Sequence, residues 1–134
     1  MVKLNKKNFV DIFISNFVPN ISKANLKKLH CYPPDGYLWG ICEYDLVQNT
    51  KFEIAKNDFD NADKSEAIEF QYDNGFKGDE YSSPLSESNN TSNKIEKSGL
   101  VEFYVIGKDY SWCYITTHEP NYCGPYFIKN INKN

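Results

Sequence analysis

Two β-rich runs near the C-terminus constrain the fold more than any other part of this sequence. The runs are "LVEFYVIG" (100–107) and "SWCYITTH" (111–118), and only the three residues "KDY" separate them. Both are rich in β-branched and aromatic residues, and two such runs joined by a short connection are typical of a β-hairpin. Alternation along the first run places Phe103 and Val105 on one face and Tyr104 on the other. The sequence therefore predicts an antiparallel pair of strands here.

Two further segments predict additional strands. "YLWGICEY" (37–44) is apolar on both of its alternating sides, and "AIEFQYD" (67–73) alternates between apolar and polar residues. In the second segment we expect Phe70 to face a core and Glu69 to face water, as in a strand with one solvated side. Together with the hairpin, these segments predict an antiparallel sheet of about four strands.

Helical patterns precede the strands. Phe9, Phe13 and Phe17 recur four residues apart and predict a helix with one broad apolar face. "SKANLKKLH" predicts a short second helix with Ser22 as its N-cap. A third helix is expected over 51–62, with Phe52, Ala55 and Phe59 on one side. Helices followed by hairpins indicate an α+β domain with the N-terminal helices packed on one face of the sheet.

The segment from about 74 to 97 is poor in residues that form a core. It contains glycines, a proline and a cluster of Ser and Asn, which predict a long polar loop with one turn of helix near 93–97. No composition shift elsewhere suggests a boundary, and 134 residues are enough for one core. We therefore expect residues 1–134 to form a single domain.

The charge of the chain is unevenly distributed. Residues 1–30 carry six lysines against one aspartate, whereas residues 53–87 carry ten carboxylates against three lysines, a net charge of −7. The chain contains no arginine, so it has no bidentate guanidinium for phosphate or guanine. The acidic middle segment argues against a nucleic-acid binder and favours a basic protein as the partner.

The cysteine and histidine spacing does not support a metal site or a cofactor. The four cysteines and two histidines lack the closely spaced pairs of a tetrahedral zinc site. Polar residues interrupt the N-terminal apolar run, no cleavage site follows it, and no stretch reaches the roughly 20 apolar residues of a membrane span. We therefore expect a cytoplasmic protein with reduced thiols.

A set of C-terminal residues resembles a known pattern. "VEFYVIGKDYSWCYITTHE" and "GPYF", with the earlier "YLWGICEY", resemble a family of short bacterial proteins of unknown function. That family has a W-x-Y-[IV]-x-T-H-E strand and a G-P-[YF]-F ending. The matching positions include Trp39, Trp112, Tyr114, His118, Glu119, Gly124 and Pro125. Such proteins are similar in size and style to the immunity proteins that protect bacteria from polymorphic toxins.

These observations favour one function above others. The resemblance and the acidic segment predict an immunity or antitoxin-like protein, not an enzyme, that binds and neutralises a basic toxin domain such as a nuclease. We expect the charged contacts, and one aromatic anchor, to lie in the acidic segment. The residues of this predicted surface are Asp58, Asp60, Asp63, Glu66, Asp79, Glu80 and Tyr81.

Two alternatives of other classes remain open. One is a small enzyme that uses His118 with Glu119 or Cys123 in a cleft at the end of the hairpin. The other is a module that binds a small molecule in an apolar pocket between Trp39 and Trp112.

Overall fold

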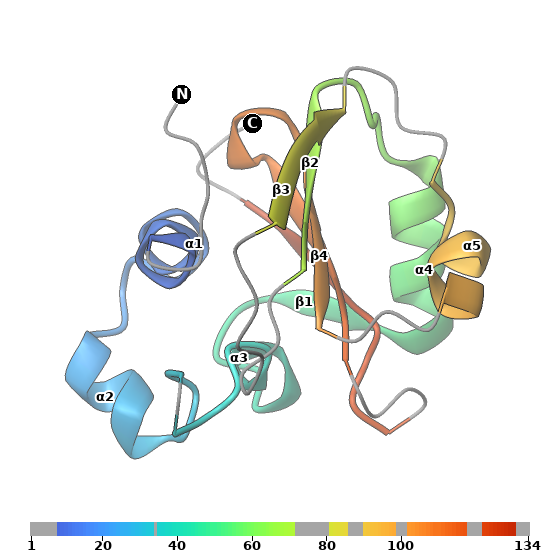
Figure 1. The fold of residues 1–134 in the computed structure, drawn as a ribbon. Coiled ribbons are helices and arrows are strands. Elements are labelled where there is room, and N and C mark those ends of the chain that lie inside the picture. Colours follow the sequence, from blue (N-terminus) through green and yellow to red (C-terminus); the bar gives the residue numbers. More distant parts are fainter. Residues whose placement is uncertain are drawn as a thin grey trace.

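The computed structural model describes residues 8–33, 35–71, 81–85, 90–98, 102–117 and 122–130. These residues form a six-stranded antiparallel sheet in the order β1-β6-β5-β4-β2-β3, together with five α-helices and one 3₁₀ turn (Figure 1). The strands are Asn49–Lys51 (β1), Ala67–Gln71 (β2), Tyr81–Leu85 (β3), Phe103–Ile106 (β4), Trp112–Thr116 (β5) and Tyr126–Lys129 (β6). The helices are Phe9–Phe17 (α1), Lys23–Lys28 (α2), Gly40–Glu43 (α3), Phe52–Asn61 (α4) and Ser92–Ser98 (α5), and the 3₁₀ turn η1 is Lys108–Tyr110. The predicted α+β class is confirmed, with six strands in place of about four.

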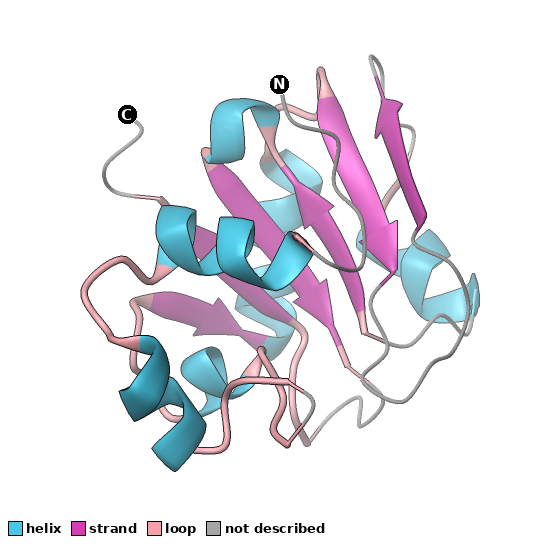
Figure 2. Cartoon of the chain, turned by 60° about the vertical axis from the view of Figure 1, so that its left-hand side comes forward, coloured by secondary structure: helices cyan, strands magenta, loops and turns pink. Residues whose placement is uncertain are grey.

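Helices lie on both sides of this sheet. Figure 1 shows α1, α2 and α3 on one side and α4 and α5 on the other. Figure 2, in which the first side comes forward, shows α1 lying across the strands. The packing of the N-terminal helices on one face is therefore confirmed, and α4 and α5 add a layer on the opposite face. Among the described residues, no helix combines the length and the apolar character that a membrane crossing requires.

The core under α1 is built largely from aromatic rings. Phe9 and Phe13 are buried, as their four-residue spacing predicts. The ring of Phe9 stacks on Phe70 of β2 with 4.3 Å between centroids, and it meets Tyr104 of β4 edge-on at 4.9 Å. Because such aromatic pairs bury large areas, this cluster fixes α1 on the sheet.

A second core lies under α4. Phe59 is fully buried and stacks on Tyr114 of β5, with 4.2 Å between ring centroids. Phe103 and Val105 belong to this core, so the predicted alternation of the hairpin is confirmed. Phe52 was expected on the same buried side, but its side chain is 40% exposed. Phe52 is the first residue of α4, and its N–H donates to the carbonyl of Pro125. This bond holds Phe52 at the end of the row of apolar residues that α4 packs on the sheet.

The strand predicted over 37–44 is wrong. This segment is a turn followed by the short helix α3, in which the N–H of Cys42 donates to the carbonyl of Trp39 at 3.0 Å. Leu38, Trp39, Ile41 and Cys42 are all buried. Apolar residues at these positions fit the spacing of a helical turn as well as that of a strand covered on both sides. A short apolar run therefore does not distinguish the two.

The long loop predicted over about 74–97 is also partly wrong. Within it, β3 pairs with β2, and α5 packs beside α4. β3 is an edge strand, so Pro84 is tolerated although it cannot donate to a sheet hydrogen bond. The predicted turn of helix near 93–97 corresponds to α5.

Glu69 was expected to face water, but it is buried at 8% exposure and accepts a hydrogen bond from the side chain of Asn90. Burial raises the pKa of Glu69, so the folded state binds its proton more tightly than the unfolded chain does. Above the pKa that Glu69 has in the folded protein, its buried charge lowers the free energy of unfolding. This cost disappears as the pH falls to the pKa that Glu69 has in the unfolded chain.

We therefore predict that Glu69→Gln stabilises the protein at pH 7 and not at pH 3.5, as measured by urea unfolding at both pH values. Equal effects at the two pH values would contradict this assignment.

Candidate functional site

An open groove of about 1100 Å³ lies on the α4 side of the sheet. Its floor is formed by Thr50, Trp112, Phe127 and Lys129. The strand register explains why these side chains meet: Thr50 lies opposite Phe127, and Trp112 lies opposite Lys129. Directly opposite residues of an antiparallel pair point to the same face of the sheet. The floor thus combines two aromatic rings with one hydroxyl and one ammonium group.

Two other elements form the walls. Asp58 and Asn61 of α4 line one wall, followed by Asp63 in the segment after the helix. The three-residue spacing of Asp58 and Asn61 places both on one side of α4. Lys108 and Asp109 of η1 form the second wall. Carboxylates therefore enter the groove from two segments that are far apart in the sequence.

The carboxylates of the α4 wall are held by hydroxyl groups. Thr50 Oγ1 donates to Oδ2 of Asp58 at 2.7 Å, which connects β1 to α4. The N–H and Oγ of Ser65 both donate to Oδ1 of Asp63, at 3.0 and 2.8 Å, and these bonds lower the pKa of Asp63. The second oxygens, Oδ1 of Asp58 and Oδ2 of Asp63, accept no hydrogen bond from the part of the chain that the structure describes. Each carboxylate therefore has one oxygen still able to accept a hydrogen bond.

The positive charge of Lys108 is already engaged. Its Nζ lies 2.8 Å from Oε2 of Glu66, and this contact raises the pKa of Lys108. Among the residues that line the groove, three carboxylates face two ammonium groups. Because Glu66 offsets one of those ammonium groups, the groove as a whole carries negative charge.

The turn that holds Asp109 has an uncommon backbone conformation. Asp109 and Tyr110 have φ values of 55° and 60°, in the left-handed region. The side chain of Asn130 donates to the carbonyl of Tyr110 at 3.0 Å, which braces the turn against the end of β6. Two consecutive residues in this region persist only where their surroundings hold them, and such positions often lie at functional sites.

Comparison with known proteins places the chain in a family. A family model described as a domain of unknown function (DUF4275) matches residues 5–127. The chain belongs to this family. No curated protein and no solved structure matches it significantly. The DUF4275 match includes both walls of the groove and all of its floor except Lys129. Membership in a family of uncharacterised proteins, predicted from the C-terminal residues, is thus confirmed.

The groove unites only part of the predicted partner-binding surface. Asp58 and Asp63 line it, and Glu66 borders it through the ion pair with Lys108. Asp79 and Glu80 lie outside the described residues, as does the side chain of Tyr81, the first residue of β3.

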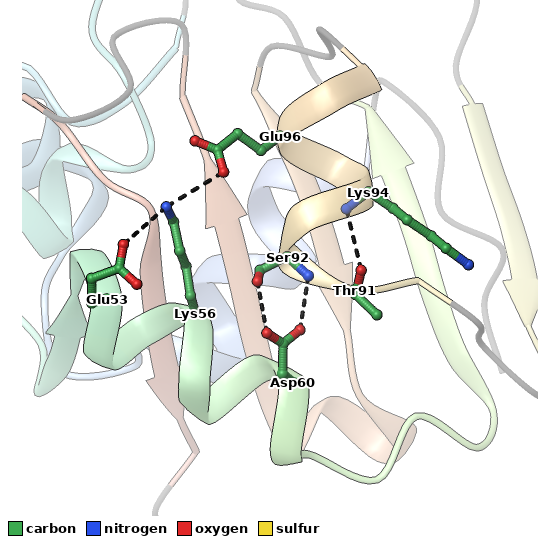
Figure 3. Close-up of polar contacts among 7 residues, drawn as sticks. All are labelled: Glu53, Lys56, Asp60, Thr91, Ser92, Lys94 and Glu96. Atoms are coloured by element: carbon green, nitrogen blue, oxygen red, sulfur yellow. Dashed lines mark hydrogen bonds and ion pairs between the residues drawn. The ribbon is translucent and has the colours of Figure 1, made fainter.

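Asp60 points away from the groove, toward α5. It accepts hydrogen bonds from the N–H and Oγ of Ser92 at 2.8 and 2.7 Å. Figure 3 shows these bonds beside Lys56, whose Nζ lies 3.3 Å from Glu53 and 3.5 Å from Glu96. Asp58 and Asp60 differ by two residues, which places them on nearly opposite sides of a helix. Asp60 therefore caps α5, and the prediction that it contacts a partner is not supported by its position.

We predict that Asp60→Ala destabilises the protein by about 1–2 kcal/mol, the usual cost of losing a helix cap. Asp63→Ala removes a carboxylate whose hydrogen bonds within the described residues come from nearby Ser65, so it should cost less. Chemical unfolding of both variants measures the difference. If Asp60→Ala and Asp63→Ala unfold at the same denaturant concentration, the capping role of Asp60 is incorrect.

The described residues of the predicted C-terminal motif have different surroundings. Trp112 forms part of the groove floor, and Tyr114 packs under Phe59. Gly124 has φ 94°, a conformation that side chains rarely adopt, and it precedes Pro125 in the turn before β6. Trp112 and Tyr114 thus belong to the sheet face on which the groove lies, whereas Gly124 lies near Tyr126 of the core under α1. His118 and Glu119 lie outside the described residues.

The predicted pocket between the two tryptophans is wrong. Trp39 belongs to the core under α1, where it stacks on Tyr37, whereas Trp112 belongs to the core under α4. The sheet separates these cores, so the described residues do not form a cavity shared by the two rings. The reason is the folding of 37–44 as a turn and helix on the α1 side instead of a strand.

The cysteines are buried thiols. Burial raises the pKa of Cys31 to about 11 and also raises the pKa values of Cys42 and Cys113. These three thiols therefore stay neutral at pH 7, a state of low nucleophilicity. Cys123, proposed as a partner of His118, is 9% exposed and packs in the core under α1. Within the described ranges, no group of three or more His, Cys, Asp or Glu side chains is placed to hold a metal ion.

Sequence reasoning missed several residues of the groove. Thr50 and Lys129 come from β1 and β6, two short strands that the periodicity did not reveal. Lys108 and Asp109 were assigned only to the hairpin connection. This charged pair next to Trp112 could have indicated the groove, because a hairpin turn presents its side chains at the end of the sheet.

Proposed function

We propose that this chain is a cytoplasmic immunity-type protein that captures and neutralises a basic bacterial toxin domain, with a nuclease as the expected class. The observation that carries this proposal is the groove itself. Asp58 and Asp63 on one wall and Asp109 on the other border one space, although they come from separate segments. Two of these carboxylates retain an oxygen that accepts no hydrogen bond from the described residues.

The charge of a nuclease explains why such a surface would inhibit it. A nuclease binds a polyanion and must present Lys or Arg side chains around its active site. A negative groove attracts that positive surface, speeds the encounter and covers the substrate site. Inhibition then requires no chemistry in the inhibitor, only a stable complex.

Exposed apolar side chains next to the groove add to this surface. Phe52 is 40% exposed and Ile54 is 62% exposed, and both belong to α4, the helix that supplies Asp58. Binding energy in protein interfaces is concentrated in a few apolar or aromatic anchors surrounded by polar contacts. α4 therefore offers both an anchor at its N-terminal end and carboxylates at its C-terminal end.

Co-expression tests the proposal directly. The probe is the C-terminal domain of the protein encoded next to this chain in its genome, expressed in a bacterial host with and without the chain. We expect the domain to arrest growth alone and the chain to restore it, and the two should purify together. If the domain is toxic and the chain neither binds it nor restores growth, the proposal is wrong.

The groove also favours a second candidate function, a module that binds a small cationic molecule. Its volume of about 1100 Å³ is close to the upper end of typical ligand pockets. The two aromatic rings of its floor supply the apolar contact that such ligands need. A small cationic metabolite that protects the chain from thermal unfolding, in the absence of any protein partner, would favour this candidate.

A further inference from the structure

The groove has the features of a receptor for a single cationic side chain. We infer that it binds an arginine of the basic partner, an inference that rests on the function proposed above. Asp58 and Asp63 of the α4 wall and Asp109 of the η1 wall line the same groove, so a cation bound in it would lie near carboxylates from two separate segments. The ion pair between Lys108 and Glu66 offsets one of the two ammonium groups of the groove, and Lys129 on the floor is the positive charge that such a cation still meets.

The hydrogen-bond pattern of the α4 wall indicates where the cation would be held. Thr50 uses Oδ2 of Asp58, and Ser65 uses Oδ1 of Asp63. The other oxygen of each carboxylate accepts no hydrogen bond from the described residues, while the first oxygen fixes the orientation of the group. Carboxylates whose position is already fixed lose little conformational freedom on binding.

The floor of the groove favours arginine over lysine. Trp112 and Phe127 stack with 5.6 Å between ring centroids, and the 8% and 9% of these side chains that stays exposed gives the floor an apolar surface. A guanidinium group is planar and weakly hydrated, so it can lie against such rings while it donates to two acceptors. An ammonium group is more strongly hydrated and would lose more solvation at the same place. The chain contains no arginine, so no guanidinium of its own can fill the groove.

The two tryptophans provide a direct readout. In the ¹⁵N-labelled protein, each indole N–H gives one NMR signal, and Trp39 lies on the opposite side of the sheet from Trp112. We propose a titration with an acetylated and amidated tetra-arginine peptide at low ionic strength. The Trp112 signal should shift and saturate while the Trp39 signal stays in place. A tetra-lysine peptide should bind at least about threefold more weakly.

A charge-matched pair of variants separates the groove from general attraction. Asp58→Asn with Asp63→Asn removes two charges from the groove, and each asparagine keeps an oxygen for Thr50 or Ser65. Glu53→Gln with Glu96→Gln removes two charges from the outer surface of α4 and α5 (Figure 3). We expect the first pair to weaken tetra-arginine binding at least tenfold and the second to change it less than twofold. Equal weakening by both pairs, or a Trp112 signal that does not respond, would overturn the inference.

The same variants distinguish this inference from the proposed function. If the neighbouring toxin domain binds the wild type and the groove variant equally well, the function stands and the arginine site is wrong. If tetra-arginine binds in the groove and no toxin domain is captured, the site stands and the immunity function is wrong. Tetra-lysine binding as tightly as tetra-arginine would refute the choice of arginine.

Discussion

Replacing Phe59 by alanine should reduce the free energy of unfolding by about 3–5 kcal/mol. Phe59 is fully buried, stacks on Tyr114 at 4.2 Å and meets Trp112 edge-on at 5.9 Å. Its loss would open a cavity between α4 and the sheet. Phe59 is also a contact between α4, which forms one wall of the groove, and Trp112, which forms part of the floor. Domains of this kind have total stabilities of about 5–15 kcal/mol, so the variant should be close to unfolding at room temperature. Urea unfolding followed by circular dichroism measures the change.

Phe52→Ala is the matched control for this prediction. It removes the same side chain from the same helix, but from a position that is 40% exposed. The expected loss is less than about 1.5 kcal/mol, because less apolar surface leaves water there. Comparable losses for Phe52→Ala and Phe59→Ala would show that α4 does not pack on the sheet through Phe59.

Gly107→Ala should reduce stability by about 1–3 kcal/mol, the usual cost of overpacking a core. A methyl group at Gly107 would lie 2.7 Å from Cδ1 of Trp112 and closer still to Cε2 and Nε1. The backbone of Gly107 has φ −70° and ψ 167°, which alanine adopts without strain. The cost therefore arises from the indole ring alone, and relieving it would require Trp112 to move within the groove floor. Thermal unfolding measures the loss.

A double-mutant cycle isolates this contact. In a Trp112→Leu background the smaller side chain leaves room for the added methyl group, so Gly107→Ala should then cost much less than in the wild type. The same cost in both backgrounds would mean that Gly107 is required for a reason other than the indole ring.

Periodicity predicted the elements whose pattern is long. The alternation of Phe103, Tyr104 and Val105 identified β4, and the four-residue spacing of Phe9, Phe13 and Phe17 identified α1. The strand prediction for residues 37–44 failed because an apolar run of that length fits the period of a helix as well as that of a strand. β1 and β3 were missed because "NTK" and "YSSPL" have little intrinsic strand preference, so their pairing with β6 and β2 decides their conformation.

The groove was less accessible to prediction than the fold. Sequence charge located the acidic segment, and Asp58 and Asp63 within it, but charge alone did not separate Asp58 from Asp60. Helical geometry separates them once α4 is known. The remaining parts required strand order: Thr50 and Lys129 reach the groove because β1 pairs with β6, and β6 with β5. No local pattern contains that information.

The affinity of the purified chain for the C-terminal domain of the protein encoded next to it, the proposed toxin, tests the central claim most directly. Isothermal titration of the wild type, the groove variant with Asp58→Asn and Asp63→Asn, and the surface variant with Glu53→Gln and Glu96→Gln gives three values to compare. We predict nanomolar binding that weakens with added salt, a loss of at least tenfold for the groove variant, and little change for the surface variant. Absence of binding by the wild type, at any salt concentration, would contradict the claim that this chain acts by presenting an acidic groove to a basic protein.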